Sequence, residues 1–224
     1  MPKDIKTRAY VLRRTNYGEA DRILNLITPE GKVSAIAKGV RKAKSRLAGG
    51  VEMFVLSEIN LHQGKSDLMT VTGAKMLKYH SQIVTDLERM ELAAEILKRV
   101  SRAAESTDNP EYFKITEQGL AGIDSGINLG LVECWSLMNL AKASGEEVNA
   151  YRDINGNNLD PQKRYTWDIS EMALAENTGG PIGVSEIKTM RLILTADLAI
   201  INKIKGVGEI IPELLKIAYM VARK

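Results

Sequence analysis

Residues 17–50 decide the fold, and they read YGEADRILNLITPEGKVSAIAKGVRKAKSRLAGG. The first part, over residues 20–28, is rich in apolar side chains. Thr28-Pro29-Glu30-Gly31 then places proline and glycine where a tight turn requires them. Residues 32–40 return to an alternation of inward-facing and outward-facing side chains. The pattern predicts two antiparallel strands joined by a turn.

The same stretch continues into a dense cluster of positive charge. Five cations fall within nine residues, with no acid among them: Lys38, Arg41, Lys42, Lys44 and Arg46. The cluster could be only a solvated loop, but its self-repulsion favours contact with a polyanion. We therefore expect these five side chains to bind DNA phosphates, and the patch to be extended by Arg13, Arg14 and Arg22.

The motif in residues 17–50 resembles the N-terminal signature of the bacterial RecO family. The shared pattern is approximately YGE.D.I, then T..GK, then A.KG.R..KSRL, and it is present here with its spacing kept. This resemblance covers roughly thirty residues, and the rest of the chain adds no comparable motif. It implies an oligonucleotide-binding (OB) fold and a function in DNA repair and recombination.

Three more strands are expected in the first 79 residues. Apolar and polar side chains alternate in residues 5–14 and in a stretch of about eleven residues that ends near residue 62. Residues 68–77 give the last strand. Five short strands in fewer than eighty residues suggest a small closed barrel, and with a cationic face this is most simply an OB fold. The fold class is thus α+β, with residues 1–79 forming a five-stranded OB-fold barrel and residues 80–224 an α-helical bundle.

Helical periodicity begins after residue 80. Five residues with helical spacing predict the buried stripe of the first helix, namely Leu87, Met90, Ala94, Leu97 and Ser101. An irregular insertion at residues 146–181 interrupts the bundle, with a strand expected over residues 164–169. Between the last two helices, Gly206-Val207-Gly208 resembles the hairpin of helix-hairpin-helix DNA binders, although a simple turn is the preferred interpretation.

Composition limits the classes of function. Residues 1–48 carry a net charge of +8, whereas the remaining residues sum to −5. This segregation predicts one part that binds nucleic acid and one that does not. No apolar run is long enough to span a membrane, and the first residues predict no secretory signal. A single cysteine, Cys134, suits a reducing cytoplasm, so we expect a cytoplasmic, nucleoid-associated protein.

The sequence gives little support for catalysis or for a cofactor. It has no P-loop and no dinucleotide fingerprint, and His62, His80 and Cys134 fit no nucleophile pattern. Many RecO relatives hold zinc with four cysteines in the insertion, but residues 146–181 contain no cysteine or histidine. We therefore expect no metal site there. Packing of apolar residues should hold the insertion instead, through Tyr165, Trp167, Ile169, Met172 and Leu174.

Aromatic residues for stacking bases are scarce in the barrel: only Tyr10, Tyr17, Phe54 and Tyr79 are available. Binding to single-stranded DNA should therefore be mainly electrostatic and weakly selective for base sequence.

The resemblance implies a non-enzymatic mediator of DNA repair and homologous recombination. Such a protein binds single- and double-stranded DNA, anneals complementary strands, and helps RecA load on DNA covered by single-strand binding protein. Its implied partners are RecR, the C-terminal tail of single-strand binding protein and, indirectly, RecA. Cations that could rim a groove for that acidic tail are Lys188, Arg191, Lys203 and Lys205. The alternative is an accessory nucleic-acid-binding subunit, or substrate clamp, of a DNA- or RNA-processing enzyme.

Overall fold

The computed structural model describes residues 3–64, 68–105 and 109–222. The chain divides into two compact units, Met1–Asp124 and Ser125–Lys224. The boundary between these units differs from the expected boundary at residue 79. The barrel itself does end at Tyr79, but two helices that follow it pack on the barrel and belong to the same unit.

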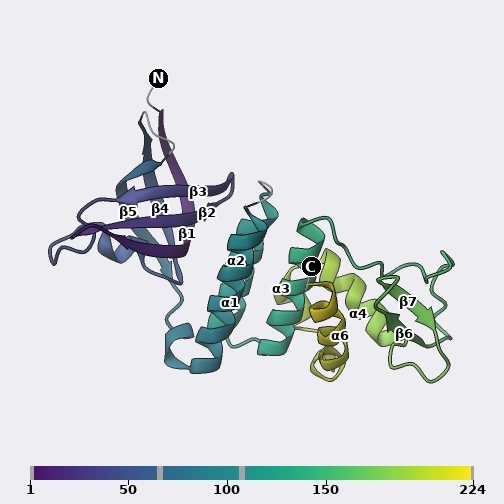
Figure 1. The fold of residues 1–224 in the computed structure, drawn as a ribbon. Helices are drawn as coiled ribbons and strands as arrows, with labels where there is room; N and C mark the ends of the chain where they lie inside the picture. The colour runs from purple at the N-terminus through teal and green to yellow at the C-terminus, as the bar shows by residue number, and fades with distance from the viewer. Residues whose placement is uncertain (1–2, 65–67, 106–108, 223–224) are drawn as a thin grey trace. The chain divides into compact units, whose positions relative to one another are not determined.

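The first unit is built on a closed five-stranded barrel (Figure 1). Neighbouring strands pair in the order β1-β2-β3-β5-β4, and all of these pairs are antiparallel except β3 with β5. The five predicted strands are confirmed, with these bounds: β1 Lys3–Tyr17, β2 Asp21–Thr28, β3 Gly31–Ala37, β4 Val55–Gln63 and β5 Met69–Tyr79.

The turn between β2 and β3 lies where the sequence places it. Thr28 pairs with Gly31, and the Thr28 hydroxyl donates a hydrogen bond to the Gly31 carbonyl at 2.9 Å. Gly31 has a φ of 128°, a conformation that glycine adopts without steric cost. Alternating side chains from all five strands, together with Val40 and Val51, fill the barrel: Ala9, Val11, Leu24, Leu26, Ala35, Ala37, Ile59, Leu61 and Val71.

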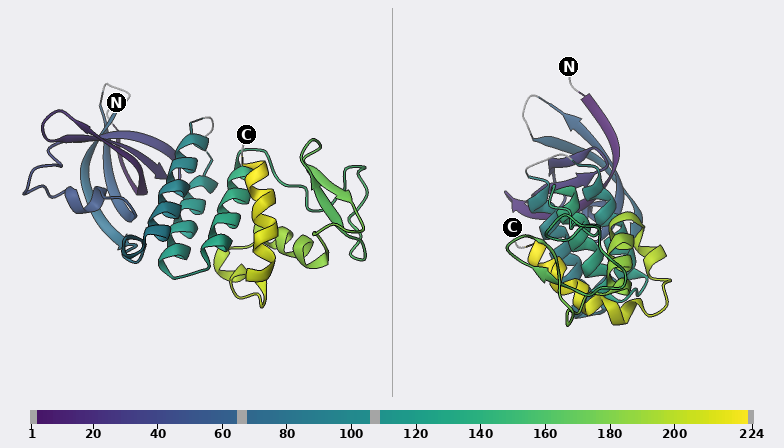
Figure 2. Two further views of the ribbon diagram at one scale, coloured as in Figure 1. Left: turned by 60° about the horizontal axis from the view of Figure 1, so that its bottom comes forward. Right: turned by 90° about the vertical axis from the view of Figure 1, so that its right-hand side faces the viewer.

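Helices α1 (Leu87–Ala103) and α2 (Glu111–Asp124) run side by side in both views and contact the barrel (Figures 1 and 2). Tyr10 of β1 is buried, and its ring centroid lies 5.8 Å from that of Phe113 on α2. The Lys32 ammonium donates to the Ser101 carbonyl at 2.9 Å, which ties β3 to α1. Apolar packing and buried polar contacts thus make the barrel and these helices one body.

The predicted buried stripe of α1 is wrong in its first half. Leu87, Met90 and Ala94 are exposed, Leu87 to 64%. The helix instead buries a neighbouring row, which consists of Ala93, Ile96, Leu97, Val100 and Ser101. Both rows have helical spacing, so periodicity could not choose between them. The contacts of α1 with β1, α2 and the 3₁₀ helix η2 (Ile83–Thr85) decide which row is buried.

The second unit is mainly helical. Helix α3 (Leu129–Ala143) packs against α4 (Val184–Thr195) and α6 (Val207–Val221), and the short α5 (Leu198–Ile201) lies between these two in the chain. Asn128 caps α3 by accepting a hydrogen bond from the Leu131 N–H at 3.0 Å. Across both units, no helix in the described residues is long and apolar enough to cross a lipid bilayer.

The insertion contains more regular structure than expected. The predicted strand is present as β6 (Tyr165–Asp168), and it pairs with a second strand, β7 (Ala173–Glu176), that the sequence did not predict. Tyr165 and Leu174 are buried, as expected. Ile169 is not part of this packing, because it lies in the turn after β6 and is 64% exposed.

Candidate nucleic-acid interface

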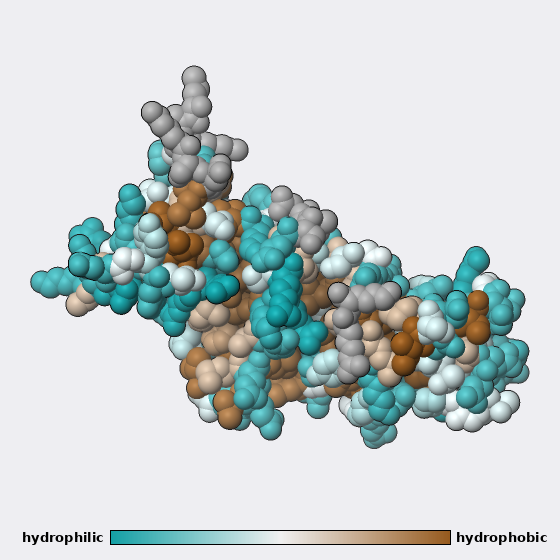
Figure 3. Space-filling model, in the orientation of Figure 1, coloured by the Kyte–Doolittle hydropathy of each residue, from teal (hydrophilic) through white to brown (hydrophobic). Residues whose placement is uncertain are grey.

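All five cations predicted to bind phosphates lie in one exposed loop after β3, which we call the cationic loop (residues 38–46). Each of the five side chains is exposed, and none forms an ion pair with any residue that the structure describes. The end of the barrel that carries this loop is predominantly hydrophilic at its surface (Figure 3). The loop can therefore offer its charge to a ligand.

The cationic loop is fixed in place near its start. Val40 is buried in the barrel core, and the Arg41 N–H donates to the Ala20 carbonyl at 2.9 Å. The Gly39 N–H donates to Asp21 Oδ1 at 2.7 Å, and Gly39 has a φ of 63°. A buried anchor and contacts with the β1–β2 turn thus preorganise the loop, so binding DNA costs less ordering entropy.

The three arginines predicted to extend the patch differ in their surroundings. Arg13 is exposed on β1, next to an irregularity in the β1–β2 pairing. Arg14 and Arg22 instead share one acid, Glu52, with each guanidinium bonded to a different carboxylate oxygen. Arg22 lies opposite Ala37, directly before the cationic loop, and of the three arginines only Arg13 has no ion pair in the described residues. The sequence could not predict that Glu52 pairs with these arginines, because it follows Arg22 by thirty residues.

The four barrel aromatics divide into two kinds. Tyr10 and Phe54 are buried and belong to the core, so neither ring can stack on a base. Tyr17 is 55% exposed and directly precedes Gly18, whose carbonyl accepts a hydrogen bond from Arg41. Tyr79 is also exposed, at the end of β5. Tyr17 is thus the aromatic ring best placed to stack on a base held by the cationic loop.

His80 is a buried polar residue that directly follows the end of β5. Its Nε2 lies 3.1 Å from the Tyr10 hydroxyl, and its Nδ1 lies 3.4 Å from Asp124 Oδ2. Burial lowers the pKa of His80 below 6.5, and the nearby Lys78 charge adds to this effect, whereas Asp124 opposes it. Burial also raises the pKa of Tyr10, so the tyrosine hydroxyl stays protonated beside the imidazole. The cluster joins β1, the residue after β5, and the last residue of α2.

The cations predicted to rim a partner groove lie in the second unit. Lys188, Lys203 and Lys205 are exposed. Arg191 is engaged: its Nε donates to the Ala150 carbonyl at 2.9 Å, and its guanidinium lies 4.7 Å from the centre of the Tyr151 ring. Arg191 therefore holds the start of the insertion against α4.

The Gly206-Val207-Gly208 segment forms a turn before α6. Gly206 has a φ of 78° and precedes the first helical residue. Glu209 lies in the first turn of the helix, where its negative charge disfavours a phosphate. These features favour the interpretation as a turn between helices.

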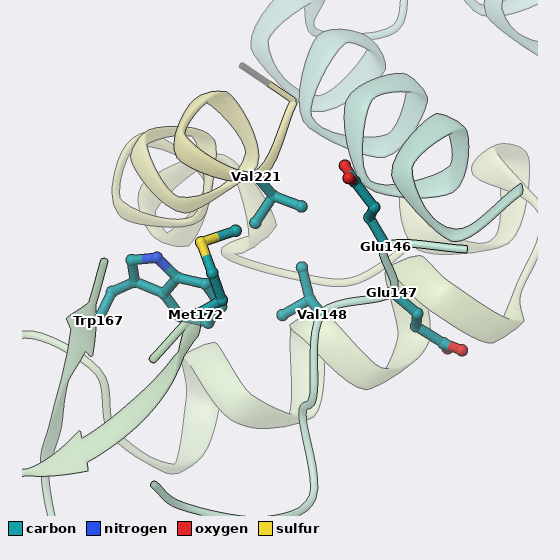
Figure 4. A pocket seen from close by; sticks show the side chains of 6 residues that line it. All are labelled: Glu146, Glu147, Val148, Trp167, Met172 and Val221. Atoms are coloured by element: carbon teal, nitrogen blue, oxygen red, sulfur yellow. The ribbon is translucent and has the colours of Figure 1, made fainter. Parts of the chain in front are cut away.

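The insertion has a pocket but no cluster of metal ligands. No group of three or more His, Cys, Asp or Glu side chains that could hold a metal occurs in the described part of the chain. A pocket of about 150 Å³ lies where the insertion meets α6, and Trp167, Met172, Val148 and Val221 form its apolar side (Figure 4). Glu146 and Glu147 line the other side. Apolar contacts thus connect the hairpin to the helices.

The strand order and the single parallel β3–β5 pair define an OB fold, and the exposed cationic loop adds a positively charged surface to it. The class of protein is therefore an OB-fold protein with an attached helical unit.

Comparison with known proteins identifies the family. Residues 1–80 match the family model described as "Recombination protein O N terminal". The chain is 31% identical to the DNA repair protein RecO of Dehalococcoides mccartyi, over 95% of this chain and 87% of that protein. It is 39% identical to the RecO of Heliobacterium modesticaldum over 51% of this chain and 42% of the relative. The chain belongs to the RecO family, whose members are DNA repair and recombination proteins.

Proposed function

We propose that this protein is a non-enzymatic mediator of DNA repair and homologous recombination in the cytoplasm, at the nucleoid. The barrel binds single-stranded DNA through phosphates, and it anneals complementary strands. By helping to displace single-strand binding protein, it allows RecA to load. The observation that carries the proposal is the cationic loop, whose five exposed cations form no ion pair with the described residues and whose start is anchored on an OB barrel.

The helical unit supplies protein contacts in this proposal. RecR and the acidic C-terminal tail of single-strand binding protein are its partners, and RecA is reached indirectly. Lys188, Lys203 and Lys205 remain the candidate cations for the tail, because all three are exposed on the second unit. Arg191 is a weaker candidate, since the Ala150 carbonyl and the Tyr151 ring already engage its guanidinium.

The cationic loop is tested by reversing three of its charges. Each neutralised phosphate should contribute about −0.7 to the slope of log K against log salt for a single strand, so four or five contacts predict a slope of roughly −3. The combined variant Arg41→Glu, Lys42→Glu and Lys44→Glu should flatten this slope and abolish binding near physiological salt. Fluorescence anisotropy of a labelled oligodeoxythymidine over a salt series measures both quantities.

The control variant carries the same charge reversals elsewhere, at Lys188, Lys203 and Lys205 of the second unit. It should bind the oligonucleotide with the parent's affinity and slope, and should lose affinity for an acidic tail peptide. Circular dichroism should show both triple variants folded, because all six side chains are exposed. A folded cationic-loop variant that binds DNA as tightly as the parent would overturn the proposal.

A further inference from the structure

We propose that Arg14 and Arg22 form a single phosphate-binding site, and that the Glu52 carboxylate occupies this site in the free protein. DNA must displace Glu52 to reach the two arginines, so Glu52 limits the affinity of the barrel. This inference rests on the proposed binding of DNA by the barrel, and it adds a site with a built-in competitor to the cationic loop.

The pairing of β1 with β2 brings the two arginines together. Arg22 lies opposite Asn16 in the register, and Arg14 is two residues from Asn16 on the same strand. The two arginine side chains therefore lie on the same face of the β1–β2 ribbon as diagonal neighbours. Two like charges at this distance repel each other unless an anion lies between them.

Glu52 supplies that anion, with one oxygen for each arginine. Its Oε2 accepts from Arg14 Nη1, and its Oε1 accepts from Arg22 Nη1 at 3.2 Å. Arg22 Nε also donates to Asn16 Oδ1 at 3.3 Å, which holds the guanidinium in position. A phosphodiester has two non-bridging oxygens that could take the same donors, because guanidinium groups bind carboxylates and phosphates with similar geometry.

The site is open to a ligand. The side chains of Arg14 and Glu52 are 35% and 43% exposed, and that of Arg22 is 21% exposed. An ion pair this accessible to water stabilises the fold only slightly, so an incoming phosphate can compete for the arginines.

The backbone around Glu52 fixes where its carboxylate lies. The residue follows the 3₁₀ helix η1 (Ala48–Val51), and Gly50 of that helix packs directly on Ala74 of β5. On its other side, Phe54 is buried with a φ of 61°, and its carbonyl accepts from the His80 N–H at 3.1 Å. The turn that carries Glu52 is thus held at both ends, and it presents the acid to the arginines before DNA arrives.

The experiment compares Glu52→Gln with the matched variant Glu58→Gln in the full chain. Both remove one negative charge from the barrel, but Glu58 pairs with Lys6, far along β1 from Arg14. Binding of labelled oligodeoxythymidine is measured by anisotropy over a salt series. For Glu52→Gln we expect affinity at low salt to rise roughly three- to tenfold, as one added charge-assisted contact would give. The salt slope should become more negative by about 0.7, the contribution of one added phosphate.

Adding Arg14→Gln and Arg22→Gln to the Glu52→Gln variant should return the slope to that of the parent. If Glu52→Gln binds no more tightly than Glu58→Gln, the carboxylate does not compete with DNA and the inference is overturned. If the parent itself shows no salt-dependent binding, the proposed function fails instead, so the two failures are distinguishable.

Thermal unfolding by circular dichroism checks that Glu52→Gln still folds with its two arginines unpaired. If it does not fold, Glu52→Asp replaces it. This variant keeps the negative charge but is one methylene shorter, so it cannot bridge both guanidinium groups. A steeper slope for Glu52→Asp than for the parent, at unchanged net charge, supports the site, and an unchanged slope overturns it.

Discussion

The cationic side chains on the barrel differ in whether they form ion pairs with other residues. Arg8 pairs with Glu117 at 3.2 Å, and Lys32 lies against the end of α1, where it bonds to Ser101 and Glu105. These cations hold the helices to the barrel. The five cations of the cationic loop form no ion pair with the described residues, so their charge remains available to a ligand. A count of charges in the sequence cannot make this distinction.

Tyr17 is the residue where base stacking can be tested. We expect Tyr17→Ala to weaken binding of oligodeoxythymidine by about 1–3 kcal/mol, because it removes an exposed ring beside the cationic loop. Tyr17→Phe keeps the ring and should bind like the parent, which makes it the control. The salt slope should stay the same in both variants, since no phosphate contact is lost. Equal affinities for the alanine and phenylalanine variants would show that Tyr17 does not stack.

His80 should make the stability of the first unit depend on pH. The pKa of the buried imidazole is lowered below the ordinary 6.5, so on acidification the unfolded chain binds a proton before the folded chain does. The free energy of unfolding should therefore fall as the pH drops below about 6.5, by up to ~1.4 kcal/mol per pH unit from this group.

His80→Gln removes this titration while keeping polar atoms near the Tyr10 hydroxyl. Urea unfolding of residues 1–124 at pH 7.5 and pH 5.5 measures the difference, and the variant should lose less stability than the parent between the two values. The same loss in both proteins would mean that other groups cause the pH dependence.

At the scale of elements, η1 connects the segment after the cationic loop to β5. It starts two residues after Arg46, and the backbone of Gly50 packs directly against Ala74 of β5. The element thus fixes the far end of the loop, while Val40 fixes the start of it. Both anchors are apolar or backbone contacts, and of the charged side chains between them Arg41 also donates to the Gly18 carbonyl at 3.3 Å.

Gly50→Ala and Gly49→Ala form a matched pair that tests this connection. A Cβ on Gly50 would lie 2.7–2.9 Å from the Cβ and backbone of Ala74, whereas a Cβ on Gly49 would meet only the end of Met76 at 4.0 Å. We expect Gly50→Ala to destabilise the barrel by about 1–3 kcal/mol through overpacking, and Gly49→Ala to have little effect. Urea denaturation measures both values, and similar stabilities would contradict the close packing of η1 on β5.

At the scale of the whole molecule, the chain forms two compact units, and the first of them contains the barrel together with α1 and α2. Tyr10, Lys32 and the His80 cluster all use partners in α1 or α2. The N-terminal family model ends at residue 80, whereas the unit that packs together here runs to Asp124. Helices α1 and α2 therefore cover the side of the barrel formed by β1 and β2.

Two fragments test the boundary of the first unit. Residues 1–124 should unfold cooperatively and bind oligodeoxythymidine with the salt slope of the full chain. Residues 1–79 should be less stable by several kcal/mol, since truncation exposes Tyr10 and removes Phe113, and losing one buried phenylalanine alone costs about 3–5 kcal/mol. Thermal and urea unfolding compare the two. A fragment 1–79 as stable as 1–124 would place the boundary at the end of the barrel.

The sequence by itself determined the five strands, the turn at residues 28–31 and the position of the cationic loop. Each depends on neighbours in the chain: alternation, turn residues and charge density are local properties, and their physical consequences are local. Only the tertiary structure decided which apolar row α1 buries, that Glu52 lies between Arg14 and Arg22, that Arg191 holds Ala150, and that the first unit ends at Asp124. These features join residues far apart in sequence, and such contacts exist only after the chain has closed its barrel and packed its helices.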